Sequence, residues 1–377
     1  MQELKNLIKL VLSRLYFLFN KSPKKIIEID KYCNLFFGYY DVSSFNLSEN
    51  LIACHGQVKA DSEEVDIIIY NLIENTYEII DTTLAWNYQQ GSRLMWFDDN
   101  NVIYNKYDQK TKKYYSVIKN IHNLSETILT LPIQALSKSG FLISLCYYNL
   151  NRAGTEYGYK YETLINEKIS ISYFNKSVSN LDLFDVNDCL NLLKVNKNNI
   201  SKPHINHILI SPNNKYFIFI YRFYINDKRF DNLFGYQIES NKLNLLIDNQ
   251  VISHYTYRSN EELLMWCIID DVPGYYSYNF VSKSLLLKLK VNEDGHPTFI
   301  DSNLFITDTY PNIFSRQKLS LIELNTGVEK LLLNVSHPEK YSSYNRCDLH
   351  PSLSNSKTKY QIDFIHKKRR KICVGNL

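Results

Sequence analysis

Residues 209–222 read LISPNNKYFIFIYR, a short polar turn that leads into a strand rich in Phe, Ile and Tyr. Ser, Pro and Asn favour a chain reversal, and the aromatic and β-branched residues after them favour extended structure. The same combination recurs at SSFNLSENLIACHG (43–56), MWFDDNNVIYN (95–105), YRSNEELLMWC (257–267), TFIDSNLFITDT (298–309) and PSLSNSKTKYQIDF (351–364). The chain is therefore built from repeats of one small β unit.

A second unit, two strands joined by a tight polar turn, follows most of these copies. Examples are IIIYNLIENTYEII (67–80) and KLSLIELNTGVEKLLL (318–333), where we expect Gly327 to supply the positive φ of a hairpin turn. One module in about 40–55 residues is the spacing of a four-stranded propeller blade. The sequence predicts an all-β fold, a seven-bladed β-propeller over residues 31–377, with two packed β-sandwiches as the alternative.

The composition agrees with this architecture. The 377 residues include 30 Tyr and 19 Phe but only five Ala. Because Ala is the best helix former, a helical bundle and an α/β fold with Ala-rich crossover helices are both excluded. The chain is 45% hydrophobic and 22% charged, which also excludes a disordered protein.

Two segments fall outside the repeats. Residues 1–30 contain apolar residues at helical spacing from Leu4 to Phe19, interrupted by Lys and Arg, and predict an amphipathic helix and linker. Two interpretations stay open, a helix in peripheral contact with an anionic membrane through residues 1–20 and a helix packed on the protein. Residues 149–199 are polar and rich in Asn, and we expect an insertion that covers one face, with a short helix near 185–195.

Charge and cysteine content narrow the class of protein. A net charge of +4 is too small to indicate nucleic-acid binding, and we interpret the basic run at 367–371 as a solvated strand end or turn. The seven Cys are scattered without a CxxC motif, which favours a reduced, cytoplasmic compartment over a disulfide framework or a zinc site. The sequence contains neither a Gly-rich phosphate loop nor a GxSxG elbow, so it gives no support to a nucleotide hydrolase or a serine hydrolase.

Histidines recur at the same position of four successive repeats. They lie in KPHINH (202–207), SHYTYR (253–258), DGHP (294–297) and RCDLHP (346–351), each directly before a turn-and-strand unit. In a propeller these loops converge on the central axis, so we expect one shared polar site that includes His204, His207, His254, His296 and His350. Neutral imidazoles with the carboxylate of Asp348 would hold a divalent transition metal, and a free His could act as a base near neutral pH.

Other polar and aromatic residues fall near the same loops. Guanidinium groups could bind a substrate carboxylate through two hydrogen bonds, and the candidates are Arg152, Arg222, Arg258 and Arg346. Aromatic side chains can pack on sugar rings, and the candidates are Tyr39, Tyr40, Trp86, Tyr255 and Tyr257. Gln90 and Arg93 precede the strand of the second repeat in the register of the His loops, and Asn206 lies inside the first loop. All of these are predicted to face the axis.

The turn Ser211-Pro-Asn-Asn-Lys215 resembles the blade turn of TolB-type propellers, and this likeness extends over about residues 35–377. The segments DGHP, DLHPSLS (348–354) and SHYTYR resemble, more narrowly, the oligogalacturonate lyase-like propellers, over the last four blades only. The segments DGHP and TDTYP (307–311) are also similar to propellers from bacterial surface-polysaccharide gene clusters.

The lyase resemblance implies a seven-bladed propeller that cleaves uronate-containing oligosaccharides by β-elimination with a metal, usually manganese. His296 and His350 match its His-Pro metal positions, whereas Asn345 and Asp348 stand where the family has Gln and His, so the metal site is altered. The family uses a His base assisted by an Arg, for which the candidates here are His207 or His254 with Arg222 or Arg258. The predicted function is a lyase acting on acidic glycans, and the alternative is a non-catalytic propeller that binds a glycan or a protein.

Overall fold

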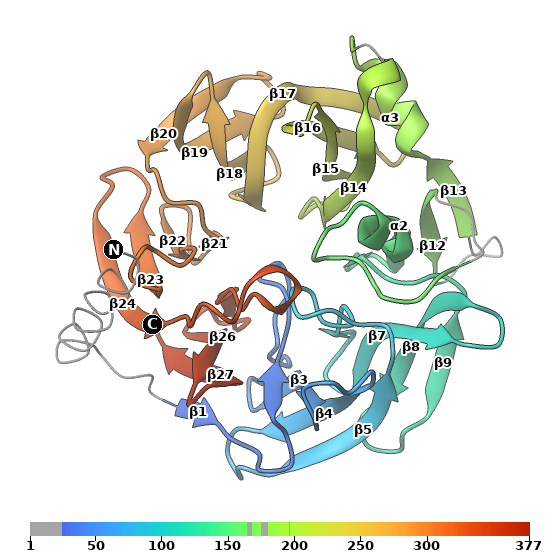
Figure 1. Ribbon diagram of the computed structural model, residues 1–377, viewed down its shortest axis with the longest axis vertical. Helices are drawn as coiled ribbons and strands as arrows, with labels where there is room; N and C mark the ends of the chain where they lie inside the picture. The colour runs from blue at the N-terminus through green and yellow to red at the C-terminus, as the bar shows by residue number, and fades with distance from the viewer. Residues whose placement is uncertain (1–24, 164–167, 175–179, 196) are drawn as a thin grey trace.

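The computed structural model describes residues 25–163, 168–174, 180–195 and 197–377. These residues form a ring of antiparallel sheets around a central axis (Figure 1). Five sheets have four strands and one has seven, and the seven-stranded sheet counts as two blades because its long middle strand serves both. The predicted seven-bladed propeller is therefore confirmed, and the two-sandwich alternative is excluded. The predicted N-terminal helix lies outside the described residues.

The first three blades follow one another along the chain. Blade 1 has the strands β2 (Asn34–Phe36), β3 (Leu51–Gln57), β4 (Val65–Asn71) and β5 (Tyr77–Thr83). Blade 2 has β6 (Met95–Trp96), β7 (Asn101–Asp108), β8 (Lys113–Asn120) and β9 (Glu126–Leu129). Blade 3 has β10 (Ala135–Leu136), β11 (Phe141–Ser144), β12 (Ile169–Tyr173) and β13 (Asn180–Phe184). The innermost strand of each blade is the first in sequence.

Blades 4 and 5 share one long strand. Blade 4 has β14 (Ser201–Ile210), β15 (Tyr216–Ile225), β16 (Lys228–Gln237) and the first part of β17 (Lys242–Tyr257). Blade 5 has the second part of β17 with β18 (Glu262–Ile269), β19 (Val272–Asn279) and β20 (Leu285–Lys290). The outermost strand of one blade thus continues, without a break, as the innermost strand of the next.

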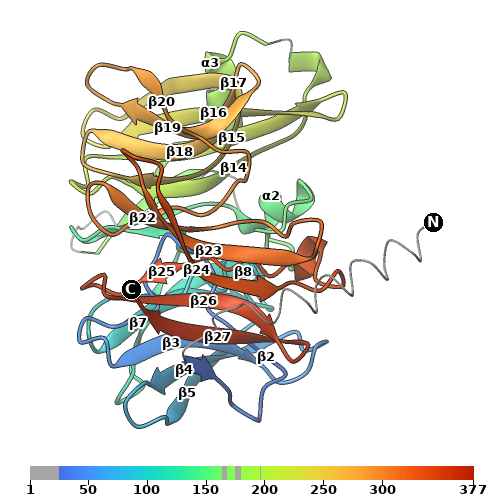
Figure 2. The same cartoon turned by 90° about the vertical axis from the view of Figure 1, so that its left-hand side faces the viewer.

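The last two blades close the ring. Blade 6 has β21 (Thr298–Phe299), β22 (Leu304–Asp308), β23 (Arg316–Glu323) and β24 (Glu329–Ser336). Blade 7 has β25 (Ser352–Leu353), β26 (Lys359–His366) and β27 (Arg369–Asn376), and its fourth strand is β1 (Lys25–Ile27) from the other end of the described chain. Figure 2 shows β26 and β27 crossing the side of the ring. The domain boundary predicted at residue 31 therefore falls too late, because residues 25–27 already belong to the propeller.

Residues 149–199 differ from the predicted single insertion. Within them β12 and β13 complete blade 3, and each of these strands, ISISY and NLDLF, has only five residues. The extra material is a segment between β11 and β12 with helix α2 (Tyr147–Arg152), and a second helix α3 (Val186–Leu192) with the 3₁₀ turn η1 (Lys197–Asn199). Asp185 caps α3 through Asn187 N and Asp188 N, so the helix expected near 185–195 is present.

The core lies between neighbouring blades. The Ile, Val and Tyr residues that alternate along the middle strands are buried there, as in β4, where Ile67 and Ile68 are fully buried on opposite faces. Apolar residues of the outermost strands stay exposed, for example Ile128 in β9. Gly327 has φ 73° in its hairpin, as the sequence predicted.

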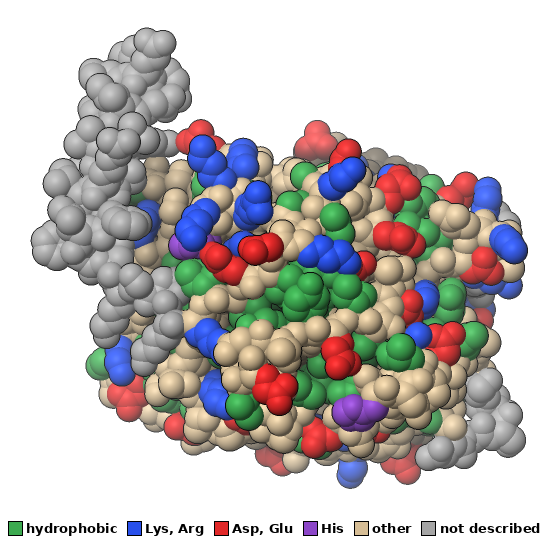
Figure 3. All heavy atoms as spheres, turned by 90° about the horizontal axis from the view of Figure 1, so that it is seen from below, with side chains coloured by type: hydrophobic (Ala, Val, Ile, Leu, Met, Phe, Trp, Pro, Cys, Tyr) green, Lys and Arg blue, Asp and Glu red, His purple; other side chains and the backbone are tan. Residues whose placement is uncertain are grey.

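The basic run at 367–371 is a strand end and turn, as predicted, but it is solvated only in part. Lys367 and Lys368 form the exposed turn between β26 and β27 with positive φ at both residues, whereas Arg370 and Lys371 in β27 are buried. Figure 3 shows Lys and Arg side chains together with Asp and Glu side chains on one side of the ring. The seven Cys all lie in described residues, and they form no disulfide with one another. Within the described residues, helices long and apolar enough to cross a membrane are absent.

Candidate functional site

The structure brings four of the five predicted histidines together at the axis. The rings of His254 and His296 have centroids 3.9 Å apart, His296 and His350 4.3 Å, and His207 and His254 5.6 Å. All four are buried and come from the loops and inner strands of blades 4 to 7. Tyr39 from blade 1 contacts all four rings. We refer to these five residues as the axial cluster.

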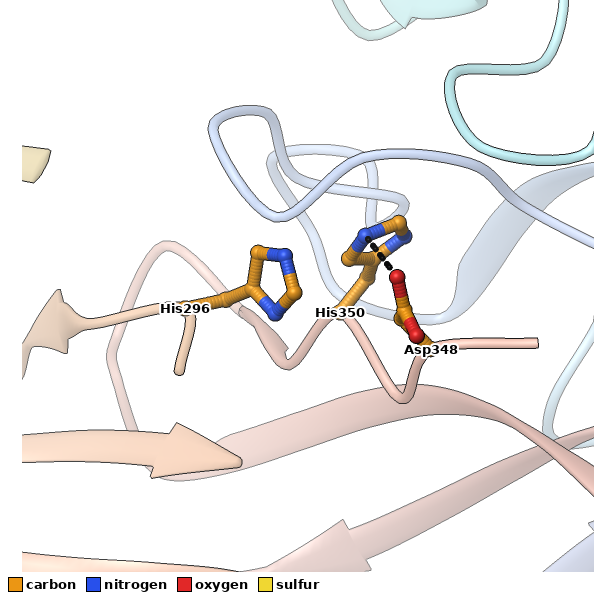
Figure 4. A group of neighbouring side chains, drawn as sticks. All are labelled: His296, Asp348 and His350. Atoms are coloured by element: carbon orange, nitrogen blue, oxygen red, sulfur yellow. Dashed lines mark ion pairs between the residues drawn. The ribbon is translucent and has the colours of Figure 1, made fainter. Parts of the chain in front are cut away.

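Two histidines of the cluster and Asp348 offer ligand atoms to a cation. One ligand atom from each of His296, Asp348 and His350 lies within 4.8 Å of the others, as Figure 4 shows for the three side chains. His296 Nε2, His350 Nε2 and Asp348 Oδ1 are buried and lack a hydrogen-bond partner among the described residues. Two imidazoles and a carboxylate suit a divalent transition metal. These residues therefore fit the metal that the sequence predicted.

The other polar atoms of these three side chains form hydrogen bonds that fix their orientation. His296 Nδ1 lies 2.8 Å from Asp308 Oδ1, and His350 Nδ1 donates to the carbonyl of Gly38 at 2.7 Å. Such bonds fix the ring orientation and direct the lone pair of Nε2 to a metal. Asp348 Oδ2 accepts from Arg346 Nε at 2.7 Å, which leaves Oδ1 for the metal. Asn345 lies exposed and outside this group, although it stands at a ligand position of the resembling family.

Two glycines allow the close approaches that this arrangement needs. Gly38 has φ 137°, and a Cβ there would lie 2.8 Å from the backbone of Gln90. Gly295 of the DGHP segment packs on Asp308, where a Cβ would lie 1.9 Å from the Asp308 carbonyl oxygen. Both contacts are too short for any side chain. The DGHP segment is therefore built so that its His reaches Asp308.

His254 has a different set of partners. Its Nδ1 lies 3.1 Å from Asp294 Oδ1 and 3.1 Å from Ser253 Oγ, and Ser253 Oγ donates to Asp294 Oδ2 at 2.5 Å. All hydrogen bonds that the described residues give His254 go through Nδ1. A carboxylate on Nδ1 holds the tautomer whose Nε2 can accept a proton. The pKa of Asp294 is lowered, against the effect of burial, by His254 and Ser253.

Burial sets the protonation of the other groups in the cluster. Desolvation and neighbouring charges hold the pKa values of His207, His296 and His350 well below their usual range, so these imidazoles are neutral. Burial also raises the pKa of Asp348, against the effect of Arg346, and raises that of Asp308 to about 7. Neutral imidazoles keep the lone pairs that metal binding requires.

Aromatic residues close the cluster. Tyr39 Oη lies 2.8 Å from His207 Nδ1, and Tyr157, from the segment after α2, packs against His207 with ring centroids 4.8 Å apart. Burial raises the pKa of Tyr39 well above 10, so its hydroxyl is protonated. Tyr40 bonds to the backbone carbonyl and amide of Tyr255, whose own hydroxyl bonds to the carbonyl of His207. Figures 1 and 2 show α2 on one face of the ring, toward the axis.

Arg346 links the metal ligands to the segment after α2. Its Nε binds Asp348, its Nη1 lies 2.9 Å from Glu156 Oε2, and its guanidinium carbon lies 5.0 Å from the ring centroid of Tyr310. The predicted role of Arg346 was to bind a substrate carboxylate. In this structure the guanidinium group of Arg346 already binds Asp348 and Glu156, so Arg346 positions Asp348.

Four other predicted arginines lie in ion pairs or on the surface. Arg93 is fully buried and makes two hydrogen bonds of 2.9 Å to Asp41. Arg222 binds Asp231, which stands opposite it on the neighbouring strand β16. Arg258 binds Glu262 and the carbonyl of Ser302. Arg152 is exposed at the end of α2. A carboxylate already pairs with the guanidinium group of Arg93, of Arg222 and of Arg258.

Four remaining predicted residues also take structural positions. His204 faces Arg222 across strands β14 and β15, and its Nδ1 bonds to the carbonyl of Lys202. Tyr257 packs between blades with Tyr216 and Phe280. Gln90 is buried with its backbone against Gly38. Asn206 is buried on β14, and its side chain has no hydrogen-bond partner among the described residues.

Several residues that contact the cluster were not predicted from the sequence. Asp294 and Asp308 each hold a histidine, and Tyr157, Glu156 and Tyr310 cover the site. Asp294 and Asp308 were visible in the DGHP and TDTYP segments, and a carboxylate next to a His in a converging loop is the pattern that could have identified them. The residues after α2 lie in a segment without repeat pattern, so no sequence feature pointed to them.

Comparisons with known proteins place the fold. No family model matches the chain, and no curated protein matches it. An oligogalacturonate lyase solved in complex with manganese has a TM-score of 0.66 at 10% identity, over 91% of this chain and 90% of that one. The oligogalacturonate lyase of Vibrio parahaemolyticus has a TM-score of 0.62 at 10% identity, over 94% and 92% of the two chains.

A further similar structure is the β-propeller domain of the Trilobed protease from Pyrococcus furiosus, with a TM-score of 0.52 at 10% identity over 90% of this chain and 95% of that one. TolB from Acinetobacter baumannii is also among the similar structures. At these identities the likeness establishes the fold and leaves activity open. The chain therefore has the β-propeller fold that the oligogalacturonate lyases share with other propellers, as its repeats and His-Pro segments predicted.

Proposed function

We propose that this protein is a lyase that cleaves acidic, uronate-containing oligosaccharides or polysaccharides by β-elimination. The observation that carries the proposal is the pairing of two sites at the axis. His254, oriented by Asp294, lies 3.9 Å from His296 between ring centroids, and His296 belongs to the group that fits a metal. A base beside a cation site is the arrangement that proton abstraction next to a carboxylate requires.

The reaction would use these residues as follows. A divalent metal held by His296, Asp348 and His350, with manganese as our candidate, would stabilise the negative charge that develops on the uronate carboxylate. His254 Nε2 would take the hydrogen α to the carboxylate, and Asp294 would stabilise the resulting imidazolium. The electrons of that C–H bond form the new carbon–carbon double bond as the β C–O bond breaks. Tyr39, protonated and beside His207, is the candidate donor of the proton to the leaving oxygen.

The test is a search for the unsaturated product. The full chain is incubated with a panel of acidic polysaccharides and added manganese, and the ultraviolet absorbance of the unsaturated uronate is followed. The proposal expects product from at least one uronate glycan and its loss in His254→Ala and in His350→Ala. His122→Ala, at an exposed histidine, is the matched control that should keep full activity. If no acidic glycan yields this product, the lyase proposal fails.

A non-catalytic propeller that binds a glycan or a protein is the second candidate. The observation that favours it is the burial of the cluster, since His254, His296 and His350 are each 2% exposed beneath Tyr157 and Tyr310. Saturable glycan binding by the wild type, unchanged in His254→Ala and without product, would support this candidate over the lyase.

A further inference from the structure

A pocket of ≈ 320 Å³ is linked to the metal-site residue Asp348 through the side chain of Arg346. Its walls come from the loop after β3, from the loop between β5 and β6, from the segment around α2 and from η2 (Ser343–Asn345). Glu156 belongs to the pocket wall and also to the ion pair with Arg346, which in turn binds the metal-site residue Asp348. One glycan chain could therefore reach from this pocket to the cluster.

Aromatic and amide side chains shape the pocket. Trp86 and Tyr88 pack edge to face with centroids 5.1 Å apart, and Trp86 Nε1 is fixed by the carbonyl of Glu63 at 2.7 Å. Tyr344, in η2, also lines the pocket and is 53% exposed. The side-chain amides of Asn151 and Asn345 make no hydrogen bond with described residues. Rigid aromatic rings with free amides beside them suit the apolar faces and hydroxyl groups of a sugar ring.

The charge of the pocket argues against a uronate. Its described lining has three carboxylates, Asp61, Glu63 and Glu156, against the single ammonium of Lys160. Lys160 is paired with Glu63, and Asp61 has no ion-pair partner among the described residues. Arg370 lies 3.9 Å from the ring centroid of Tyr88, but it is buried and bonded to the carbonyls of Asn345 and Arg346. A substrate carboxylate here would meet like charge without a free cation to bind it.

We propose that this pocket is a subsite for a sugar ring that carries no carboxylate, next to the uronate bound at the axial cluster. The inference rests on the proposed function and narrows its substrate to mixed acidic glycans, in which uronates alternate with uncharged or amino sugars. A homopolymer of uronate would place a carboxylate in an acidic pocket. The sugar next to the uronate, by carrying or lacking a carboxylate, therefore determines which glycans are substrates.

The test measures binding to the full chain carrying His254→Ala, which prevents turnover. Three trimers are titrated by calorimetry: N-acetylglucosamine, glucosamine and galacturonate. We expect one of the first two to bind more tightly than the galacturonate trimer. Tyr344→Ala should weaken that binding roughly fivefold or more, as should Trp86→Ala. Tyr77→Ala is the matched control, an exposed tyrosine on the outer strand β5, and should leave it unchanged.

A charge variant tests whether the acidic lining excludes a substrate carboxylate. Asp61→Lys, at an exposed site, should raise the affinity for the galacturonate trimer severalfold and leave the N-acetylglucosamine trimer unaffected. Tighter binding of the galacturonate trimer in the unmodified pocket, or no binding of either hexosamine trimer, would overturn the subsite. Because these titrations need no product, the subsite can stand if the lyase proposal fails, and a lyase active on polygalacturonate alone would refute the subsite only.

Discussion

His254 and His296 have ring centroids only 3.9 Å apart, yet their neighbours prepare them for different tasks. Asp294 and Ser253 hold His254 at Nδ1, and Asp308 holds His296 at Nδ1. His296 Nε2 points into the group with His350 and Asp348, whereas His254 lies outside that group. Each imidazole therefore has its own carboxylate at Nδ1, and membership of the group with His350 and Asp348 distinguishes the metal ligand His296 from the base His254.

Asp294 is the positioning residue whose effect on the base is most direct. Asp294→Asn removes the charge that stabilises the His254 imidazolium, and we expect the rate of elimination to fall by about 10²-fold or more. The pH dependence of the rate should also differ from wild type, because the variant removes the carboxylate charge beside His254 Nδ1. The measurement is a pH–rate profile, with calorimetric manganese titration as the control. An unchanged profile would show that Asp294 does not act through His254.

Asp308 should act on the metal site instead. Asp308→Asn weakens the hold on His296 Nδ1, and loss of such a bond typically costs about 10–100-fold in metal affinity. Manganese titration of the apo protein measures this effect without any substrate. Asp301→Asn, at an exposed turn residue that bonds only to backbone amides nearby, is the matched control. Equal manganese affinity in Asp308→Asn and wild type would contradict the assigned site.

At the scale of elements, strand β1 closes the ring. Its three residues pair with Val374, Cys373 and Ile372 of β27, and Ile27 is fully buried between blades 7 and 1. Ile27→Ala should lower the free energy of unfolding by about 2–5 kcal/mol, because it leaves a cavity at the closure. Urea unfolding measures this. Ile73→Ala, at a side chain that is 73% exposed, should cost less than about 0.5 kcal/mol. Equal effects in the two variants would show that the closure carries little stability.

The strands also explain why the number of blades was predicted from the sequence, whereas the strands of blade 3 and the arginine ion pairs were not. Turn-and-strand units such as 209–222 repeat because each blade must make the same four strands, so their period gave the blade number. The strands β12 and β13 have only five residues each, and they were assigned to an insertion. The ion pairs of the arginines were not predicted, for a different reason. Arg222 and Asp231 are partners across two strands, and only the strand register places them together.

The histidines were predictable because converging loops need no exact register. Any polar side chain at that position of a blade comes near the axis, and four of the five histidines do so. His204 is three residues before His207 on β14, and it points instead toward Arg222. The contacts of Tyr157 and Glu156 depend on how one irregular segment folds back over the ring, which local sequence does not encode.

At the scale of the whole molecule, buried neutral histidines link stability to pH. Desolvation lowers the pKa of His55 from 6.5 to about 4, where Ser92 donates to its Nε2. The unfolded chain takes up the proton first, so this contribution is complete above pH 6.5 and is lost as the pH falls toward about 4. Its size is on the order of 3 kcal/mol.

The measurement is the difference in unfolding free energy between wild type and His55→Gln across that interval. The difference is needed because Asp363, whose pKa burial raises to about 7, contributes with the opposite sign. We expect the advantage of the wild type over His55→Gln to shrink as the pH falls. An advantage that stays constant would show that His55 titrates alike in the folded and unfolded chains.

We expect the axial cluster to perform β-elimination on uronate glycans with His254 as base. The decisive experiment follows the absorbance of the unsaturated product for wild type and for His254→Ala on the same glycan, with manganese present and with folding verified by circular dichroism. We expect steady product formation by the wild type and a rate at least about 10²-fold lower in the variant. Equal rates in the two proteins, or no product from either one on any uronate glycan, would contradict it.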